Sequence, residues 1–360
     1  MRLAITGVGM VTSLGYGVVG SCAAIEAGLS RPQTMGDFTV ADEEGGSYAI
    51  VSHPVAAYAE GFVELGAWIR LAAGSLQDLL HVAKLPAADD SRFWERTGLI
   101  ALAALIDERR LPAVAEGSPE SLREDYALEL VRLLQRPIPP KHVQVLALGH
   151  CGLAVALQKA WELLSGHTLE RVIVTGADSY LDAASLEWLY QQRRLKVPGR
   201  PTGLMPGQAG ASVLVESELS ARARSSPMAG RVRSVGISPA PTAHRPALHE
   251  LGMQLEGAIQ EALTSAGIEE PFHGGLLLDL NGEEWRAHVW GLAQSRLSSR
   301  LDLERCWTVL PCASLGETGA ASGPLALGVA VSRLLAHGGQ ALVCSVSDSG
   351  QAAGILLEGT

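Results

Sequence analysis

The stretch VLALGHCGLAVALQKAWELLSG, residues 145–166, joins a short apolar run through a glycine-containing turn to a long row of small and aliphatic residues. The first part predicts a buried strand, and the second predicts a helix that is buried over most of its surface. The same order returns in GAASGPLALGVAVSRLLAHG, residues 319–338, and the glycines that bound the two helices are spaced alike within one residue. Such a repeat predicts a duplicated α/β fold.

The segments around these two stretches also follow one pattern, so the chain divides into two similar halves. The first half, residues 1–222, opens with the apolar run RLAITGVGMV, and the second half, residues 223–360, opens with GRVRSVGIS. A polar stretch rich in Ser and Arg, residues 217–231, joins them. Because both small-residue helices would be buried between sheets, we expect a five-layered αβαβα core.

The composition excludes several classes of function. Hydrophobic residues make up 47% of the 360 residues, so the chain can bury a substantial core. The formal net charge of -10, with no Lys/Arg cluster interleaved with aromatics, argues against nucleic-acid binding. Arg333 interrupts the most apolar stretch, so we expect a core helix there and no membrane span. The N-terminal sequence lacks the pattern of a secretory signal peptide.

The cysteine pattern indicates a reduced, cytoplasmic protein. The five cysteines include no C-x-x-C pair, so no spacing supports a zinc or redox site. Glu284 and His288 have the i, i+4 spacing of a metal-binding pair, but no third ligand is evident, and we expect Glu283 and Glu284 to form a solvated helix start. The basic run QQRRLKVPGR, residues 191–200, is likewise interpreted as a solvated loop or helix end. We therefore predict no metal and no cofactor.

Four stretches are spread over most of the chain: LAITGVGMVTSLG (3–15), RVIVTGADSYLD (171–182), GLMPGQAGASVLVE (203–216) and SLGETGAASGPLALG (314–328). Together they resemble the β-ketoacyl-acyl carrier protein synthases, a family with the thiolase fold, and they occur in that family's order. The match is poor at residues 30–140. The resemblance implies a pseudo-twofold, thiolase-like core that is usually homodimeric.

The resemblance also indicates where catalytic residues would stand. The family places a nucleophilic Cys at the N-terminus of the buried helix, where N–H groups and the helix dipole favour a thiolate. Aligning this helix without gaps puts Gly149 at that position, whereas a shift of two residues would put Cys151 there. Asn281 occupies the place of the first catalytic histidine, and Glu317 or Thr318 lies near the place of the second. All of the family's catalytic positions therefore differ.

These differences predict the loss of condensing chemistry. In the family, two histidines stabilise the carbanion that forms on malonyl decarboxylation, and removing one hydrogen-bond donor of this kind typically costs about 2.7–4 kcal/mol. A carboxylate at Glu317 would instead repel an enolate. We expect a ketosynthase-like pseudoenzyme that acts as a binding, scaffold or accessory subunit. It would serve a condensing-enzyme complex, as the chain-length subunits of some polyketide systems do, or a type VI secretion effector cluster.

Two alternatives stay open. One is an acyltransferase or thioesterase that uses Cys151 on an acyl-carrier-protein or CoA thioester, with Asn281 donating to the carbonyl. Cys151 would then have to face a tunnel near Asn281, and His150 is a poor activating base because neighbours on a turn diverge. The other is a sensor that keeps a pocket for an acyl group or small ligand. In each case we expect a protein partner: a second copy, a related thiolase-fold protein in a heterodimer, or an acyl carrier protein.

Overall fold

The computed structural model describes residues 2–41, 46–241 and 246–360. Within these residues, ten strands form one mixed sheet in the order β10-β9-β11-β12-β8-β1-β7-β6-β4-β5. The first half of the chain supplies β1 (Leu3–Val11), β4 (Thr97–Ala103), β5 (Val143–Ala147), β6 (Arg171–Ser179) and β7 (Gln208–Glu216). The second half supplies β8 (Gly230–Ser238), β9 (Gly275–Leu278), β10 (Trp307–Val309), β11 (Gln340–Val346) and β12 (Ala352–Glu358).

The two halves of the sheet repeat one topology about its centre. There β1 pairs with β8 in an antiparallel register that sets Leu3 opposite Val232. From β1 outward the order is β7-β6-β4-β5, and from β8 outward it is β12-β11-β9-β10. In both halves the strands next to the centre are antiparallel and the outer three are parallel. This correspondence confirms the duplicated fold that the sequence repeat predicts.

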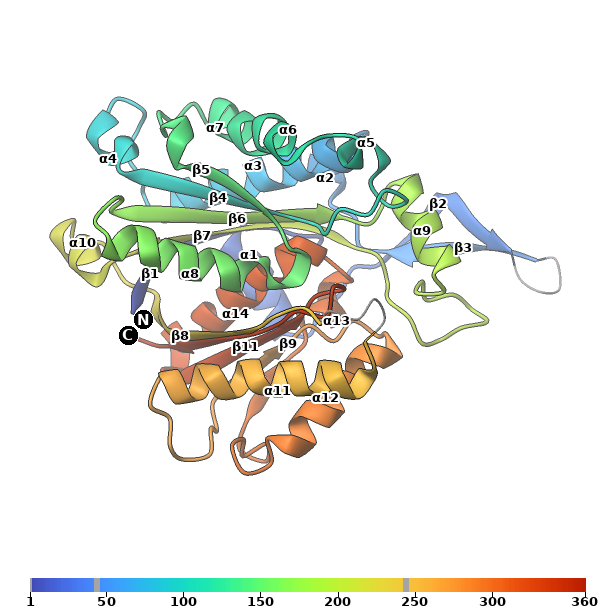
Figure 1. The fold of residues 1–360 in the computed structure, drawn as a ribbon. Coiled ribbons are helices and arrows are strands. Elements are labelled where there is room, and N and C mark those ends of the chain that lie inside the picture. The colour runs from blue at the N-terminus through green and yellow to red at the C-terminus, as the bar shows by residue number, and fades with distance from the viewer. Residues whose placement is uncertain (1, 42–45, 242–245) are drawn as a thin grey trace.

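Helices cover and separate the two halves of the sheet (Figure 1). The small-residue helices α8 (Gly152–Ser165) and α14 (Ser322–His337) lie between them and share one apolar core with both. Helix α3 (Glu64–Val82) covers the outer face of the first half, and α11 (Leu248–Ser265) with α12 (Glu284–Arg296) covers the second. The layers therefore run αβαβα, as predicted.

The central helices approach each other closely because their first turns are made of small residues. A Cβ atom added at Gly323, in α14, would lie only 2.9 Å from the Cβ of Leu153 in α8. The segment 319–337 is apolar and long enough to cross a membrane by composition alone, but 78% of its apolar window is buried inside the fold. As predicted, it is a core helix.

Residues 30–140 add elements that have no counterpart in the second half. They include the two-stranded sheet of β2 (Gln33–Ala41) and β3 (Ser47–Ser52), which projects beside α9 (Ala183–Gln191) in Figure 1.

The other helical elements along the chain are α1 (Val18–Glu26), α2 (Ala56–Ala59), α4 (Ser91–Glu95), α5 (Pro112–Ala115), α6 (Pro119–Leu122), a π-helical turn (Arg123–Leu128), α7 (Glu129–Leu134), α10 (Glu218–Ala223), α13 (Pro311–Leu315) and 3₁₀ turns at Pro140–His142, Gly149–Cys151 and Gly319–Ala321. The division that we predicted at residues 222 and 223 falls inside α10.

Candidate functional site

Two 3₁₀ turns that correspond in the duplicated fold meet at the centre of the molecule. Gly149–Cys151 connects β5 to α8, and Gly319–Ala321 leads into α14. The carboxyl ends of the parallel strands β9 and β11 open toward the same place, which is where open α/β sheets usually carry their sites. The loops that follow these two strands contain Asp279, Asn281 and Asp348. The topology thus gathers polar side chains from four distant segments.

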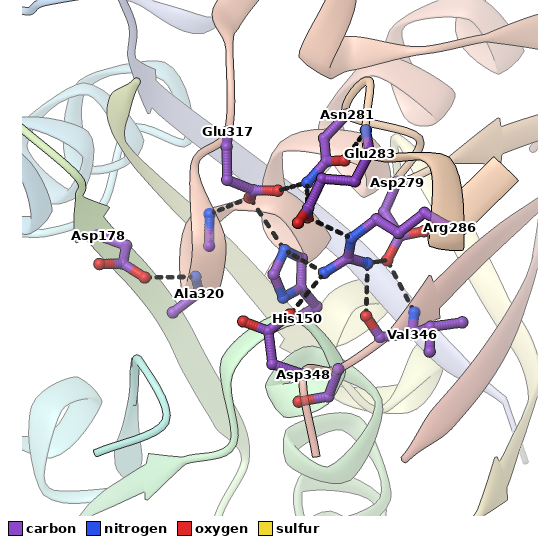
Figure 2. Close-up of polar contacts among 12 residues, drawn as sticks. His150, Asp178, Asp279, Asn281, Glu283, Arg286, Glu317, Ala320, Val346 and Asp348 are labelled. Carbon is purple, nitrogen blue, oxygen red and sulfur yellow. Dashed lines mark hydrogen bonds and ion pairs between the residues drawn. The ribbon is translucent and has the colours of Figure 1, made fainter. Parts of the chain in front are cut away.

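Glu317 is the centre of the polar contacts drawn in Figure 2. Its Oε1 lies 2.9 Å from Nε2 of His150 and accepts a 2.7 Å hydrogen bond from the backbone N–H of Gly319. Its Oε2 accepts a 2.5 Å hydrogen bond from the side-chain amide of Asn281. The structure therefore brings together Asn281 and Glu317, the two residues at the predicted histidine positions, and adds His150, which we had considered only as a neighbour of Cys151.

Arg286, on the first turn of α12, holds the other side of this cluster. Its guanidinium donates to Asp279 at 2.8 Å, to the carbonyl of Val346 at 2.6 Å and to Asp348 at 3.2 Å. Its Nη2 also lies 3.3 Å from Nε2 of His150 (Figure 2). Because Arg286 is only 2% exposed, it is a buried cation that neutralises buried carboxylates.

Arg194 lies on the side of the cluster that is nearer the surface, and its contacts differ from two of our predictions. It donates to Glu283 at 2.7 Å and to Asp348 at 2.8 Å. Glu283 was expected on a solvated helix start, but it is buried, and Arg194 was expected in a solvated loop, but it is partly buried. Both predictions were wrong because a carboxylate and a guanidinium can leave water together when each neutralises the other. Glu284, by contrast, is exposed as predicted.

The charges of this cluster stabilise one another. Burial alone would lower the pKa of His150, but the Glu317 carboxylate outweighs burial and raises that pKa above its ordinary value of 6.5. Burial would raise the pKa of Glu317, yet His150 and Arg286 hold it well below its usual range. Nε2–H of His150 therefore donates to an ionised Glu317.

These contacts leave Asn281 and Glu317 with little capacity for the chemistry of a condensing enzyme. The amide nitrogen of Asn281 donates to Glu283 at 3.0 Å as well as to Glu317, so both of its hydrogens are used. Ionised Glu317 has no hydrogen to donate and would repel a developing negative charge. Two donors for a carbanion or a thioester carbonyl are therefore not available at the predicted positions.

Cys151 faces away from this cluster. It is fully buried at the N-terminus of α8, and its thiol donates to the carbonyls of Gln351 at 3.1 Å and Ser345 at 3.7 Å. Burial raises the pKa of the thiol well above its ordinary value, which disfavours a thiolate. The helix position fits a nucleophile, but the contacts fit the interpretation of Cys151 as a small core residue.

A cavity of about 380 Å³ opens beside the cluster. Gly149, the residue that the gap-free alignment places at the nucleophile position, lines it together with His150, whereas Cys151 is not among the described residues at its wall. Gly149 has a φ of 56°, in the left-handed region that favours glycine. The cavity therefore lies where the resemblance implies a nucleophile, but the residue there has no side chain.

Sequence reasoning missed the charged half of the site. Asp279 and Asp348 follow the buried strands β9 and β11, so their position at strand ends was a usable signal. Arg194 and Arg286 gave no such signal, because their pairing depends on which loops the fold brings together. Among the described residues no group of three or more His, Cys, Asp or Glu side chains could hold a metal ion.

Comparison with solved structures identifies the fold. The oxazolomycin ketosynthase domain of Streptomyces albus JA3453 matches with a TM-score of 0.79 at 16% identity, over 100% of this chain and 74% of its own. A type II polyketide ketosynthase solved with its acyl carrier protein matches with a TM-score of 0.76 at 15% identity, over 100% of this chain and 99% of its own. The ishigamide ketosynthase/chain length factor matches with a TM-score of 0.75 at 19% identity, also over 100% and 99%.

The chain thus has the thiolase-like fold of ketosynthases. At these identities the likeness establishes the fold and leaves the activity to be argued from the site. No family model matches the sequence, and no curated protein matches it.

Proposed function

We propose that this chain is a ketosynthase-like protein without condensing activity, which works by binding another protein as an accessory or scaffold subunit. One observation carries the proposal: Asn281 and Glu317, the residues that the sequence resemblance sets at or near the histidine positions, are hydrogen-bonded to each other inside a buried ion cluster. Neither residue can replace a neutral imidazole donor, and Gly149 supplies no nucleophile. The fold is kept while the chemical groups are lost.

Two further features support a protein partner. Strand β5 lies at an edge of the sheet, paired on one side only with β4, and its residues from Gln144 to Ala147 are half-buried. An exposed strand edge of this kind can pair with another chain. Two of the similar structures are a ketosynthase with its acyl carrier protein and a ketosynthase with a chain length factor. We favour a partner of the same fold, either a second copy of this chain or a related ketosynthase-fold chain; the secretion-accessory role stays a prediction.

The test compares the wild-type chain with Gly149→Cys, which puts a thiol at the nucleophile position. A Cβ at residue 149 would lie 3.5 Å from Cγ of Leu105 and 3.6 Å from Oγ of Ser347, so a side chain fits there at the cost of about 1–2 kcal/mol for its backbone conformation. The cavity should let iodoacetamide reach the new thiol. Even so, Gly149→Cys should neither decarboxylate a malonyl thioester nor condense it.

Intact-mass measurement after incubation with an acyl thioester gives the second readout. The wild-type chain should remain unmodified, and Cys151→Ala serves as its control. Acylation of the wild type that disappears in Cys151→Ala would overturn the proposal in favour of the acyltransferase alternative. Decarboxylation by either chain would overturn it in favour of a condensing enzyme.

A further inference from the structure

We propose that the cavity beside Gly149 is a binding site for a small carboxylate that carries an apolar group. This site would not depend on the proposed partner role, because the isolated chain contains every group that forms it. The cavity, about 380 Å³ in volume, is within the range of pockets for small molecules. Leu105, Ile106 and the ring of Trp188 supply apolar wall, and Arg110 and His150 supply polar groups.

Arg110 is a buried cation that has unused hydrogen-bond donors at this wall. The residue is 4% exposed, and it donates only from Nη2, to Asp178 at 2.6 Å and to the carbonyl of Ser179 at 3.2 Å. Its Nε and Nη1 have no partner among the described residues. The ring of Tyr180 covers one face of the guanidinium, with its centroid 3.7 Å from Cζ. The group is therefore fixed in place before any ligand arrives.

Two other donors at the wall also lack partners within the described chain. Nε1 of Trp188 is buried without a hydrogen bond, and the ring lies near two guanidinium groups, 6.0 Å from Cζ of Arg110 and 5.1 Å from Cζ of Arg194. His150 makes both of its contacts through Nε2, so its Nδ1 is left over. With Nε2–H donated to Glu317, Nδ1 of His150 is left for a ligand, and a carboxylate there favours the protonated ring, in which Nδ1 is a donor.

Each carboxylate at the wall, in contrast, already has an arginine partner. Asp107 pairs with Arg109, Asp178 with Arg110, and Asp348 with Arg194 and Arg286, which it shares with Glu283 and Asp279 behind the wall. The hydrogen-bonding groups that remain unpaired at the cavity wall are N–H donors, either on cations or next to them. A carboxylate accepts several such bonds at once, and charge-assisted hydrogen bonds of this kind are about twice as strong as neutral ones. A small carboxylate therefore fits better than an amine or a neutral amide.

Isothermal titration of the intact chain with hexanoate tests this site, with hexanamide as the matched neutral probe and inorganic phosphate as a second anion. Hexanoate should bind about tenfold or more tightly than hexanamide, a ratio that corresponds to about 1.4 kcal/mol. Equal binding of the two probes, no binding of hexanoate, or binding of phosphate in its place would each overturn the assignment.

Variants locate the binding. Arg110→Lys keeps a positive charge beside Asp178 but removes the fixed Nε and Nη1 donors, so hexanoate affinity should fall about tenfold. Arg109→Lys changes an exposed neighbour and should leave the affinity unchanged. If Arg110→Lys does not fold, Trp188→Phe decides, because it keeps the aromatic ring and removes only the indole N–H. Wild-type affinity in a folded Arg110→Lys, or in Trp188→Phe where that variant decides, would place the ligand elsewhere and overturn the proposal.

Discussion

The sequence resemblance sets Glu317 near the place of a catalytic histidine, and the surroundings of Glu317 in the structure keep it ionised in a buried position. It accepts hydrogen bonds from the backbone of Gly319, from Asn281 and from the ring of His150. An imidazole is present on the opposite turn, as His150, but its Nε2 is already engaged by Glu317. An imidazole paired with a carboxylate in this way is a structural contact, in contrast to a neutral donor held ready for a substrate.

The pair can be tested by titrating His150. Its pKa should lie above 6.5 in the wild-type chain, and Glu317→Gln should move it below 6.5, because burial and Arg286, which lower it, are then opposed only by the weaker effect of Asp348. Nuclear magnetic resonance of the His150 ring measures both values. Glu284→Gln, at an exposed acid on α12, should leave the titration unchanged. An identical titration in wild type and Glu317→Gln would show that Glu317 does not raise the pKa of His150.

The same pair gives stability a defined dependence on pH. Since folding raises the pKa of His150, its contribution is fully present below pH 6.5 and is lost as the pH rises through the folded value. Since folding lowers the pKa of Glu317, its contribution is present above pH 4.5 and is lost as the pH falls through the folded value. Urea unfolding should therefore show the largest effect of Glu317→Gln between these two limits, and a reduced effect well above them, where Glu317 keeps only its contacts with Arg286 and Asn281.

At the scale of elements, helix α12 has an arginine near each end. Arg286 lies in the buried ion cluster, whereas Arg296 lies in an exposed ion pair. Arg286→Met should lower the free energy of unfolding by about 3–5 kcal/mol, because it leaves Asp279 without its buried cation and Asp348 with Arg194 alone. Arg296→Met, near the other end of the same helix, removes an exposed ion pair with Glu256 and should cost less than about 1 kcal/mol. Urea midpoints compared at equal slope measure both. Equal losses would mean that the cluster contributes no more than a surface pair.

The elements themselves were largely predictable, and the site was predictable only in part. The apolar and small residues of 145–166 and 319–338 predicted two buried helices, found as α8 (Gly152–Ser165) and α14 (Ser322–His337), because burial leaves a direct pattern in the sequence. The β2–β3 hairpin was missed, since most of its residues are exposed and leave no such pattern. Asn281 and Glu317 were found through the resemblance. Their charged partners were not, because these lie on separate loops that only the tertiary fold brings together.

At the scale of the whole molecule, the duplicated fold determines where the site lies and which two turns carry its residues. The two 3₁₀ turns meet because each leads into a central helix, α8 or α14, and the glycine at Gly323 lets those helices approach. In one half this turn carries Gly149 and His150, and in the other it follows Glu317. The duplicated turns therefore carry different side chains at one site, and the fold does not require the two turns to be alike.

The last prediction concerns assembly through the free edge of the sheet. The opposite edge strand, β10, has only three residues, whereas β5 has five and lies directly before the site. Short edge strands resist pairing, so β5 is the better edge for a partner. We expect the chain to form a homodimer at micromolar concentration, with one β5 beside the other.

Gln144→Lys tests this edge. The residue is half-buried in the free chain, so the variant should fold, but around a twofold axis it would bring like charges close together and weaken the dimer. Light scattering after size exclusion should show a dimer for the wild type and for Gln77→Lys, an exposed control on α3, and a monomer for Gln144→Lys. A wild-type monomer would exclude self-pairing and leave a related ketosynthase-fold chain as the partner to seek. A dimer that Gln144→Lys does not weaken would place the interface away from β5.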